Sequence, residues 1–260
     1  GTVHAYGGRD NLGVIRSGCG SVYYHLANDA EDGGLLVFDN GGCTYGTQTE
    51  ISTAVVDVAV ANVLITNGAN VRVQQDSTIV FGGDWSNHGD FRGEASDANH
   101  AAGTVIATNA AATSTLRGTT TFAAFSCTTP GKRLVFATDA GSLTGIGPGG
   151  ALTLLGGAGD GGNIVLRPET AGQDWALALD ATAKAEVWHV DVAHSDASRG
   201  ALTVAAVASV DSGDNRQWLF TDEIVPGATM TWNGQAGSAW GQPLNWTPQR
   251  MPTGTDRILI

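Results

Sequence analysis

The chain has 260 residues, enough for one large domain or two ordinary ones. Its 25 acidic and 13 basic residues give a net charge of −12, which argues against nucleic acid or an anionic membrane surface as a partner. Hydrophobic residues make up 42 % of the chain, which argues against disorder, but no apolar stretch is long enough to insert into a membrane.

The first feature in chain order is a pair of cysteines in similar glycine-rich settings, Cys19 and Cys43. They are candidates for a disulfide if the chain is exported, and Cys127 then stays alone in an apolar stretch. Three small buried thiols are an equally open interpretation, because sequence gives no distance between the sulfur atoms.

From residue 35 onward, short β-prone runs alternate with turns rich in glycine, asparagine and aspartate. The predicted strands are Leu35–Phe38, Val55–Val60, Val63–Ile65, Val71–Val73, Thr78–Phe81, Thr104–Ala107, Thr119–Phe125, Leu134–Ala137, Ala151–Leu155, Asn163–Leu166, Trp175–Leu179, Val187–Val192, Leu202–Val207 and Gln217–Phe220. No segment keeps a helical apolar period, so we expect an all-β fold with very little helix.

Two all-β architectures compete for this pattern. Val187–Val192 alternates like a sandwich strand, with His189 and Asp191 facing outward, whereas Leu134–Ala137 is apolar throughout and suits a more buried strand. Many short strands without helical crossovers, small stacking residues and glycine-rich turns favour a parallel β-solenoid.

Several motifs, taken together, resemble a repeat of very large secreted bacterial proteins of the adhesin and surface-fibre type. They are Gly82–Phe91, Asn163–Leu179, Val187–Val192, Ser209–Phe220 and the tryptophan-rich segment that begins at Thr231. The resemblance implies a right-handed parallel β-helix, located outside the cell or on its surface. It also implies a β-helix block at residues 1–225, and residues 226–260 as the start of the next unit or as an inter-subunit junction.

The densest group of titratable residues is His189, Asp191, His194 and Asp196. Carboxylate pairs cleave glycosides, and histidine with carboxylate binds metals. Outward-facing side chains on a strand and its turn are the simpler interpretation, and we expect no catalytic site and no metal site. For the alternative function, a polysaccharide-degrading β-helix enzyme, the candidate grouping is Asp180, Asp191 and Asp196.

No cofactor is expected from the motifs of this chain. Asp160 lies in a glycine-rich stretch that departs from the calcium-binding nonapeptide, which favours a plain turn. Acidic loops still offer oxygen ligands for loosely bound calcium. These loops contain Asp29, Glu31 and Asp32, then Asp211 and Asp214, then Asp222 and Glu223.

The C-terminal part combines Trp232, Trp240 and Trp246 with an apolar ending, Ile258, Leu259 and Ile260. The tryptophans suit either a sugar- or partner-binding surface or, as we favour, an aromatic cap over the open end of the solenoid. The ending is an apolar strand with an unpaired edge. We therefore expect a non-enzymatic fibre segment that joins other copies of itself head to tail, with surface glycans as the alternative partner.

Overall fold

The computed structural model describes residues 5–6, 18–30, 33–42, 48–51, 58–74, 76–91, 103–222, 228–252 and 256–260. Its described part is built from strands, and the only helical element in these ranges is the 3-10 turn η1 (Pro243–Asn245). The predicted all-β class with very little helix is confirmed. No helix among the described residues has the length and apolarity that crossing a bilayer requires.

Among the described residues, the main strands pair in three ladders. The first contains β1 (Ser21–Tyr24), β2 (Leu35–Asp39), β5 (Asn62–Thr66), β8 (Trp85–Asn87), the first half of β11 (Thr113–Cys127), β12 (Arg133–Phe136), β14 (Ile164–Pro168), β17 (Val190–Val192) and β20 (Val210–Asp211). All of these pairs are parallel except β1 with β2, which is antiparallel.

The second ladder begins with β3 (Thr49–Ile51), β6 (Asn70–Val73) and β9 (Asp90–Phe91), and β9 packs beside β11. It continues through β11, β13 (Leu143–Leu155), β15 (Trp175–Leu179) and β18 (Ser195–Asp196). The third ladder contains β4 (Val58–Val60), β7 (Thr78–Phe81), β10 (Thr104–Ala107), the second halves of β11 and β13, β16 (Lys184–Trp188), β19 (Val204–Val207) and β21 (Trp218–Thr221).

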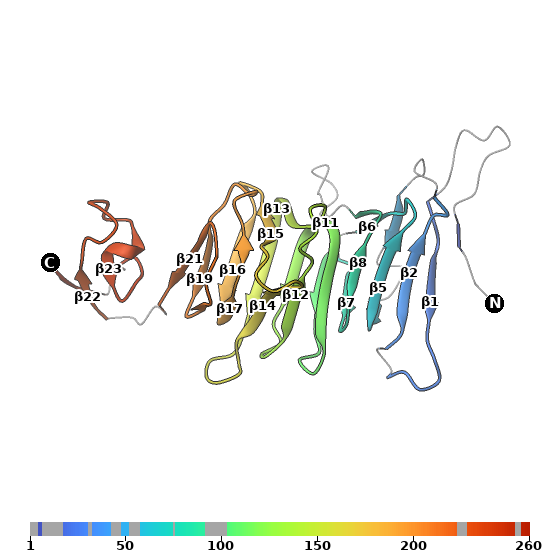
Figure 1. Cartoon of the computed structure of the whole chain (residues 1–260), viewed down its shortest axis with the longest axis horizontal. Helices are drawn as coiled ribbons and strands as arrows, with labels where there is room; N and C mark the ends of the chain where they lie inside the picture. Colours follow the sequence, from blue (N-terminus) through green and yellow to red (C-terminus); the bar gives the residue numbers. More distant parts are fainter. Residues whose placement is uncertain are drawn as a thin grey trace.

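The chain visits the ladders in a fixed order and then returns to the first. Strands β5, β6 and β7 belong to ladders one, two and three, and β8, β9 and β10 repeat that sequence one layer further on. In Figure 1 the strands follow one another along the long axis in the order of the sequence. Each pass of the chain therefore pairs with the pass before it and the pass after it.

The core lies inside the ladders and is filled by residues that stack in register. Cys127, Leu154, Val187, Ala206 and Phe220 occupy matching positions on five successive strands of the third ladder. They belong to, or pack against, one continuous hydrophobic cluster that extends over all three ladders. Burial of this apolar surface is the main favourable term that holds the stack together.

An aromatic group fills the core near its middle. Its members are Phe81, Trp85, Phe91, Phe122 and Phe125, and their neighbouring ring centroids lie 4.9–6.4 Å apart. The tilted and edge-on arrangements of these rings are the favourable ones for aromatic pairs.

A single glycine lets β11 pass from ladder one to ladder two. Gly118 has a φ of +78°, and a Cβ atom there would lie 1.7 Å from the carbonyl oxygen of Asn87. A side chain is therefore excluded both by the left-handed backbone and by the neighbouring strand. The strand turns at this point from ladder one, where Leu116 pairs with Phe136, to ladder two, where Thr120 pairs with Thr144.

One predicted strand is wrong. Val187–Val192 was expected as a single alternating strand, but it is divided between β16 in ladder three and β17 in ladder one. His189 separates them with a φ of +49°, a backbone conformation that turns the chain. The alternation of apolar residues here comes from two faces of the stack rather than from one.

The C-terminal part forms a separate small sheet in the strand order β23-β22-β24. Its strands are β22 (Thr229–Trp232), β23 (Trp246–Thr247) and β24 (Arg257–Leu259). Figure 1 shows β22 and β23 beyond β21, at the end of the stack. The boundary predicted at residues 225–226 lies outside the described residues.

Among the described residues, two hydrogen bonds connect this small sheet to the ladders. The Asp222 backbone amide donates to the Gln249 carbonyl at 3.1 Å, and the Gln249 amide donates to Asp222 Oδ2 at 2.8 Å. Met230 and Trp246 are buried but do not belong to the continuous cluster of the ladders, so the small sheet has a core of its own.

Candidate functional site

The predicted titratable group is divided among different parts of the stack. Asp191 lies on β17 in ladder one, and Asp196 lies on β18 in ladder two. His189 sits in the turn between β16 and β17, where its Nδ1 lies 3.1 Å from the Ala208 carbonyl oxygen. His194 precedes β18 and contacts other partners. The four residues do not form one site.

Asp191 is held by one side chain from another strand, β14, and by one from the loop after β20. Arg167 Nη2 donates to its Oδ2 at 2.6 Å, and Ser212 Oγ donates to its Oδ1 at 2.6 Å. Burial raises the pKa of Asp191, but these hydrogen bonds outweigh it and hold the pKa below its ordinary value. The carboxylate is therefore ionised at neutral pH and engaged on both oxygens.

Asp180 and Asp196 are occupied in local turns. The Asp180 carboxylate accepts hydrogen bonds from the backbone and hydroxyl of Thr182, and Asp196 accepts the equivalent pair from Ser198. These bonds lower the pKa of both carboxyls. A general acid for glycoside cleavage needs a raised pKa. None of the three carboxyls of Asp180, Asp191 and Asp196 therefore has the raised pKa of a general acid.

A different ionic cluster forms at a corner beside ladder two. His194 Nδ1 lies 3.6 Å from a carboxylate oxygen of Asp174 and 3.6 Å from one of Asp214. Arg216 approaches Asp174 at 3.4 Å and Asp196 at 3.6 Å. His194 and Asp196 belong to the titratable group singled out from the sequence, but their grouping with Asp174, Asp214 and Arg216 was not predicted. Asp174, His194 and Asp214 recur at equal steps along the chain.

This corner borders a pocket of about 420 Å³, lined by the ionic residues together with Gly172 and Asn215. The described residues contain no group of three or more histidine, cysteine, aspartate or glutamate side chains that fits a metal ion. The cluster links successive passes of the chain electrostatically, and a structural role accounts for all of its contacts.

The acidic loops considered for calcium also use their oxygens internally. Asp29 accepts from the Leu26 amide, Asp211 accepts from Gly213 and Asn215, and Asp222 accepts from Gln249. Glu31, Asp32 and Glu223 lie outside the described residues.

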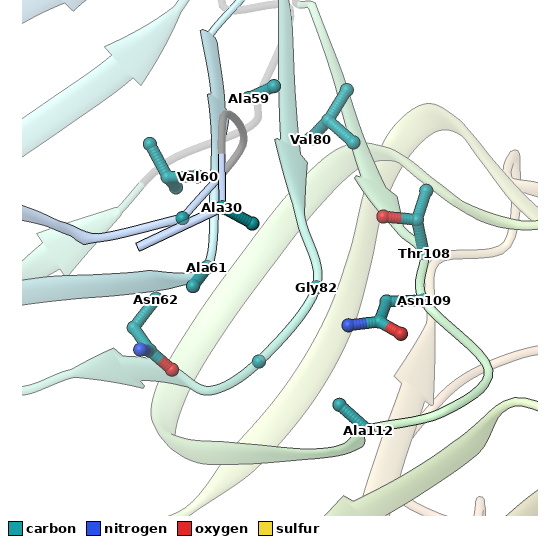
Figure 2. Close-up of a pocket in the computed structure, with 12 residues that line it drawn as sticks. Ala30, Ala59, Val60, Ala61, Asn62, Val80, Gly82, Thr108, Asn109 and Ala112 are labelled. Carbon is teal, nitrogen blue, oxygen red and sulfur yellow. The ribbon is translucent and has the colours of Figure 1, made fainter. Parts of the chain in front are cut away.

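A second pocket, of about 640 Å³, is formed where ladder three turns into ladder one (Figure 2). Alanine, glycine and valine line most of it, and its polar groups come from Asn62, Thr108 and Asn109. The lining includes no ionisable side chain, so the pocket offers shape and amide groups but no acid or base.

The cysteines give a partial answer to the disulfide prediction. Cys19 is buried, its Sγ lies 3.2 Å from Thr49 Oγ1, and burial raises its pKa. Cys43 lies outside the described residues, so the pairing of Cys19 with Cys43 stays a prediction. Cys127 is a free thiol in the core, where burial also raises its pKa.

The three C-terminal tryptophans contact one another. The Trp232 and Trp240 rings stack at 6.0 Å, and both meet Trp246 edge-on, at 5.0 and 4.6 Å. Trp246 is 1 % exposed and donates from Nε1 to the Trp240 carbonyl, whereas Trp240 is 53 % exposed. The cluster is thus the core of the small sheet, with one ring open to solvent.

The apolar ending lies at the margin of the small sheet. Ile258 and Leu259 are on β24, which pairs with β22 and is one of the two edge strands of the sheet among the described residues. Leu259 is 44 % exposed and Ile260 is 90 % exposed. An apolar edge strand with open hydrogen-bonding groups is a surface suited to pairing with another chain.

The two ends of the stack differ. At the N-terminal end β1 lies antiparallel on β2 and exposes Tyr23 and Tyr24, so β2 has a partner on its outer side. At the other end, β20 and β21 have partners on one side only among the described residues.

Comparisons of the chain with protein-family models, curated proteins and solved structures find no match.

Proposed function

We propose that this chain is a right-handed parallel β-helix that acts as a non-enzymatic structural segment of an extracellular bacterial fibre of the adhesin type. The observation that carries the proposal is the parallel pairing that continues from β2 to β20 in ladder one and from β4 to β21 in ladder three. In such an arrangement each pass of the chain is stabilised by its neighbours, and the hydrogen bonds run along the axis. A stiff, protease-resistant rod is the physical consequence.

The surface supports a role as a spacer. The chain carries a net charge of −12, and its two lysines are Lys132 and Lys184. A surface of predominantly one sign keeps neighbouring rods soluble and apart. Sideways contacts are therefore disfavoured, and joining is left to the ends.

The edge strand β24 is the proposed joint. Its exposed ending, Leu259 and Ile260, and its free edge are suited to adding a strand to the end of another copy. Head-to-tail contacts of this kind are heterologous, so they extend into filaments rather than closing as dimers.

The first prediction tests this joint directly. Concentrated wild-type protein is expected to form linear oligomers, visible by electron microscopy and by sedimentation. Deletion of residues 226–260 and the double variant L259D/I260D should both remain monomeric, because two buried charges are costly at an apolar strand junction.

L244D is the matched control, since Leu244 is an exposed leucine (40 %) in η1, between β22 and β23, and does not lie on β24. It should assemble like the wild type. A monomeric wild type at high concentration, or filaments that persist in L259D/I260D, would contradict the proposed joint.

A carbohydrate-binding adhesin is the second candidate, because Trp240 exposes half of an indole that lies nearly parallel to Trp232. Sugar rings stack on such faces. A glycan array with the wild type and W240A separates the two functions. Binding that is lost in W240A supports recognition, and no binding by either protein leaves the structural role.

A further inference from the structure

Lys132 is buried although it is a lysine. Its exposed fraction is 0 %, whereas Lys184 lies on the surface. A lysine almost never loses all contact with water unless a specific partner takes the place of the water. No ion pair of Lys132 with a carboxylate is found among the described residues, so the partner has to be of another kind.

The partner is a set of backbone carbonyl groups. Lys132 Nζ donates to the carbonyl oxygens of Gly82 at 2.8 Å, Asn109 at 3.1 Å and Ala112 at 2.9 Å. An ammonium group has three N–H donors, and all three are used here. The arrangement replaces the water shell of the cation with three fixed dipoles.

These carbonyls belong to two turns that lie at the same corner of neighbouring layers. Gly82 follows β7, and Asn109 and Ala112 lie in the turn between β10 and β11, while Lys132 itself precedes β12. Figure 2 shows Gly82, Asn109 and Ala112 at the border of the 640 Å³ pocket. One cation thus connects three successive passes of the chain.

The site is built to keep its carbonyls in place. Asn109 has a φ of 63°, and its carbonyl also accepts the Ala112 amide at 3.2 Å. The Gly82 carbonyl also accepts Ser114 Oγ at 3.1 Å. Converging carbonyl oxygens are the ligands by which proteins hold monovalent cations such as K⁺.

We propose that the carbonyls of Gly82, Asn109 and Ala112 form a monovalent-cation site that the chain fills with its own Lys132 ammonium, and that this internal cation fastens the 108–112 turn to the layers on both sides. The function as a fibre segment is not needed for this inference. Burial lowers the pKa of Lys132 to about 8, so the amine still carries its proton at pH 7.

The second prediction is a chemical rescue. K132A removes the ammonium, so the Gly82, Asn109 and Ala112 carbonyls lose the cation that joins them, and its thermal midpoint should fall by about 5–10 °C. Millimolar n-propylammonium, which restores the deleted atoms, should recover roughly half of that loss. Gly82, Asn109 and Ala112 also line the 640 Å³ pocket, and we expect the amine to enter from there. K⁺ is tested as a second, smaller occupant.

Three controls make the rescue specific. n-Propanol has the length but not the charge, tetramethylammonium has the charge but no N–H donor, and K132M fills the space of the lysine side chain with an uncharged one. Neither additive should restore the stability of K132A, and K132M should stay less stable than the wild type. K184M, at an exposed lysine, should match the wild type. Equal recovery with n-propanol, or a K132M protein as stable as the wild type, would overturn the proposal.

A measurement on the unchanged protein covers the case in which K132A does not fold. With only two lysines, ¹⁵N-lysine NMR at pH 6 assigns each side chain separately. Lys132 is expected to give an ammonium signal with slowly exchanging protons, and Lys184 a rapidly exchanging one. A neutral amine signal from Lys132, or exchange as fast as that of Lys184, would refute the internal cation.

Discussion

Asp191 illustrates how a polar side chain is retained outside the stacked core. Its carboxylate lies between Arg167 from the preceding pass and Ser212 from the following pass, and both partners donate to it at 2.6 Å. The side chains of Arg167 and Asp191 are 21 % and 23 % exposed, so solvent weakens the pair only in part. Interactions of this kind fix the register of neighbouring passes and also attract the passes to one another.

The third prediction concerns the pH dependence of this interaction. The pKa of Asp191 is lower in the folded chain than its unfolded value of about 4, so its stabilising effect is complete above that value. It is lost as the pH falls through the folded pKa. D191N should therefore cost about 1–2 kcal/mol at pH 7 in urea unfolding and much less near pH 2.

D160N is the control, since Asp160 lies exposed in a turn. It removes the same charge and should leave stability nearly unchanged at both pH values. A D191N loss of the same size at pH 7 and pH 2 would show that the carboxylate charge is not what stabilises this position.

At the scale of elements, apolar β-prone runs were sufficient to predict most of the strands. The runs Thr78–Phe81 and Thr104–Ala107 coincide with β7 and β10. One missed stretch is the first half of β13, where Gly147 and Pro148 indicate a turn. The residues before that turn, Thr144 to Ile146, pair with β11 and β15, and this pairing with distant strands is not visible in the local sequence.

The ionic corner could not be predicted from local patterns for a related reason. Asp174, His194 and Asp214 come from three passes of the chain, and only the pairing of those passes brings them together. Their equal spacing was a usable signal, but it acquires meaning only once the length of one pass is known. The register of parallel strands is a long-range property that composition does not encode.

The fourth prediction concerns the small C-terminal sheet as a unit. Arg250 donates to both carboxylate oxygens of Asp256, at 2.6 and 2.7 Å, and these side chains are 3 % and 0 % exposed. Asp256 raises the pKa of Arg250, and loss of one partner would leave a buried charge. D256N should therefore speed hydrogen exchange in residues 228–260 and leave residues 133–207 protected.

Surface-exposed Arg257, on β24, provides the control, and R257Q should exchange like the wild type. Loss of protection in the ladders of D256N would contradict the independence of the two parts. That independence is expected because the connection described between them consists of the Asp222 and Gln249 hydrogen bonds.

At the scale of the whole molecule, a stack with nearest-neighbour contacts has a stability that depends on position. Passes in the middle are held on both sides, and passes at the ends are held on one. Trp175 and Trp218 allow a test with the same residue type. Trp175 is 1 % exposed and stacks on Phe136 at 3.8 Å, whereas Trp218 is only partly buried, beside Phe220 on β21.

The fifth prediction follows from this difference. W175A opens a cavity between ladders one and two, removes the indole hydrogen bond to the Ala193 carbonyl and should cost about 3–5 kcal/mol, or roughly 6–20 °C in the thermal midpoint. W218A should lower the midpoint far less and raise hydrogen exchange mainly in residues 204–222. The contrary result is that W218A lowers the protection from hydrogen exchange in the middle of the stack as much as W175A does. In that case the passes unfold as one block, and the end at β21 does not behave as a free end.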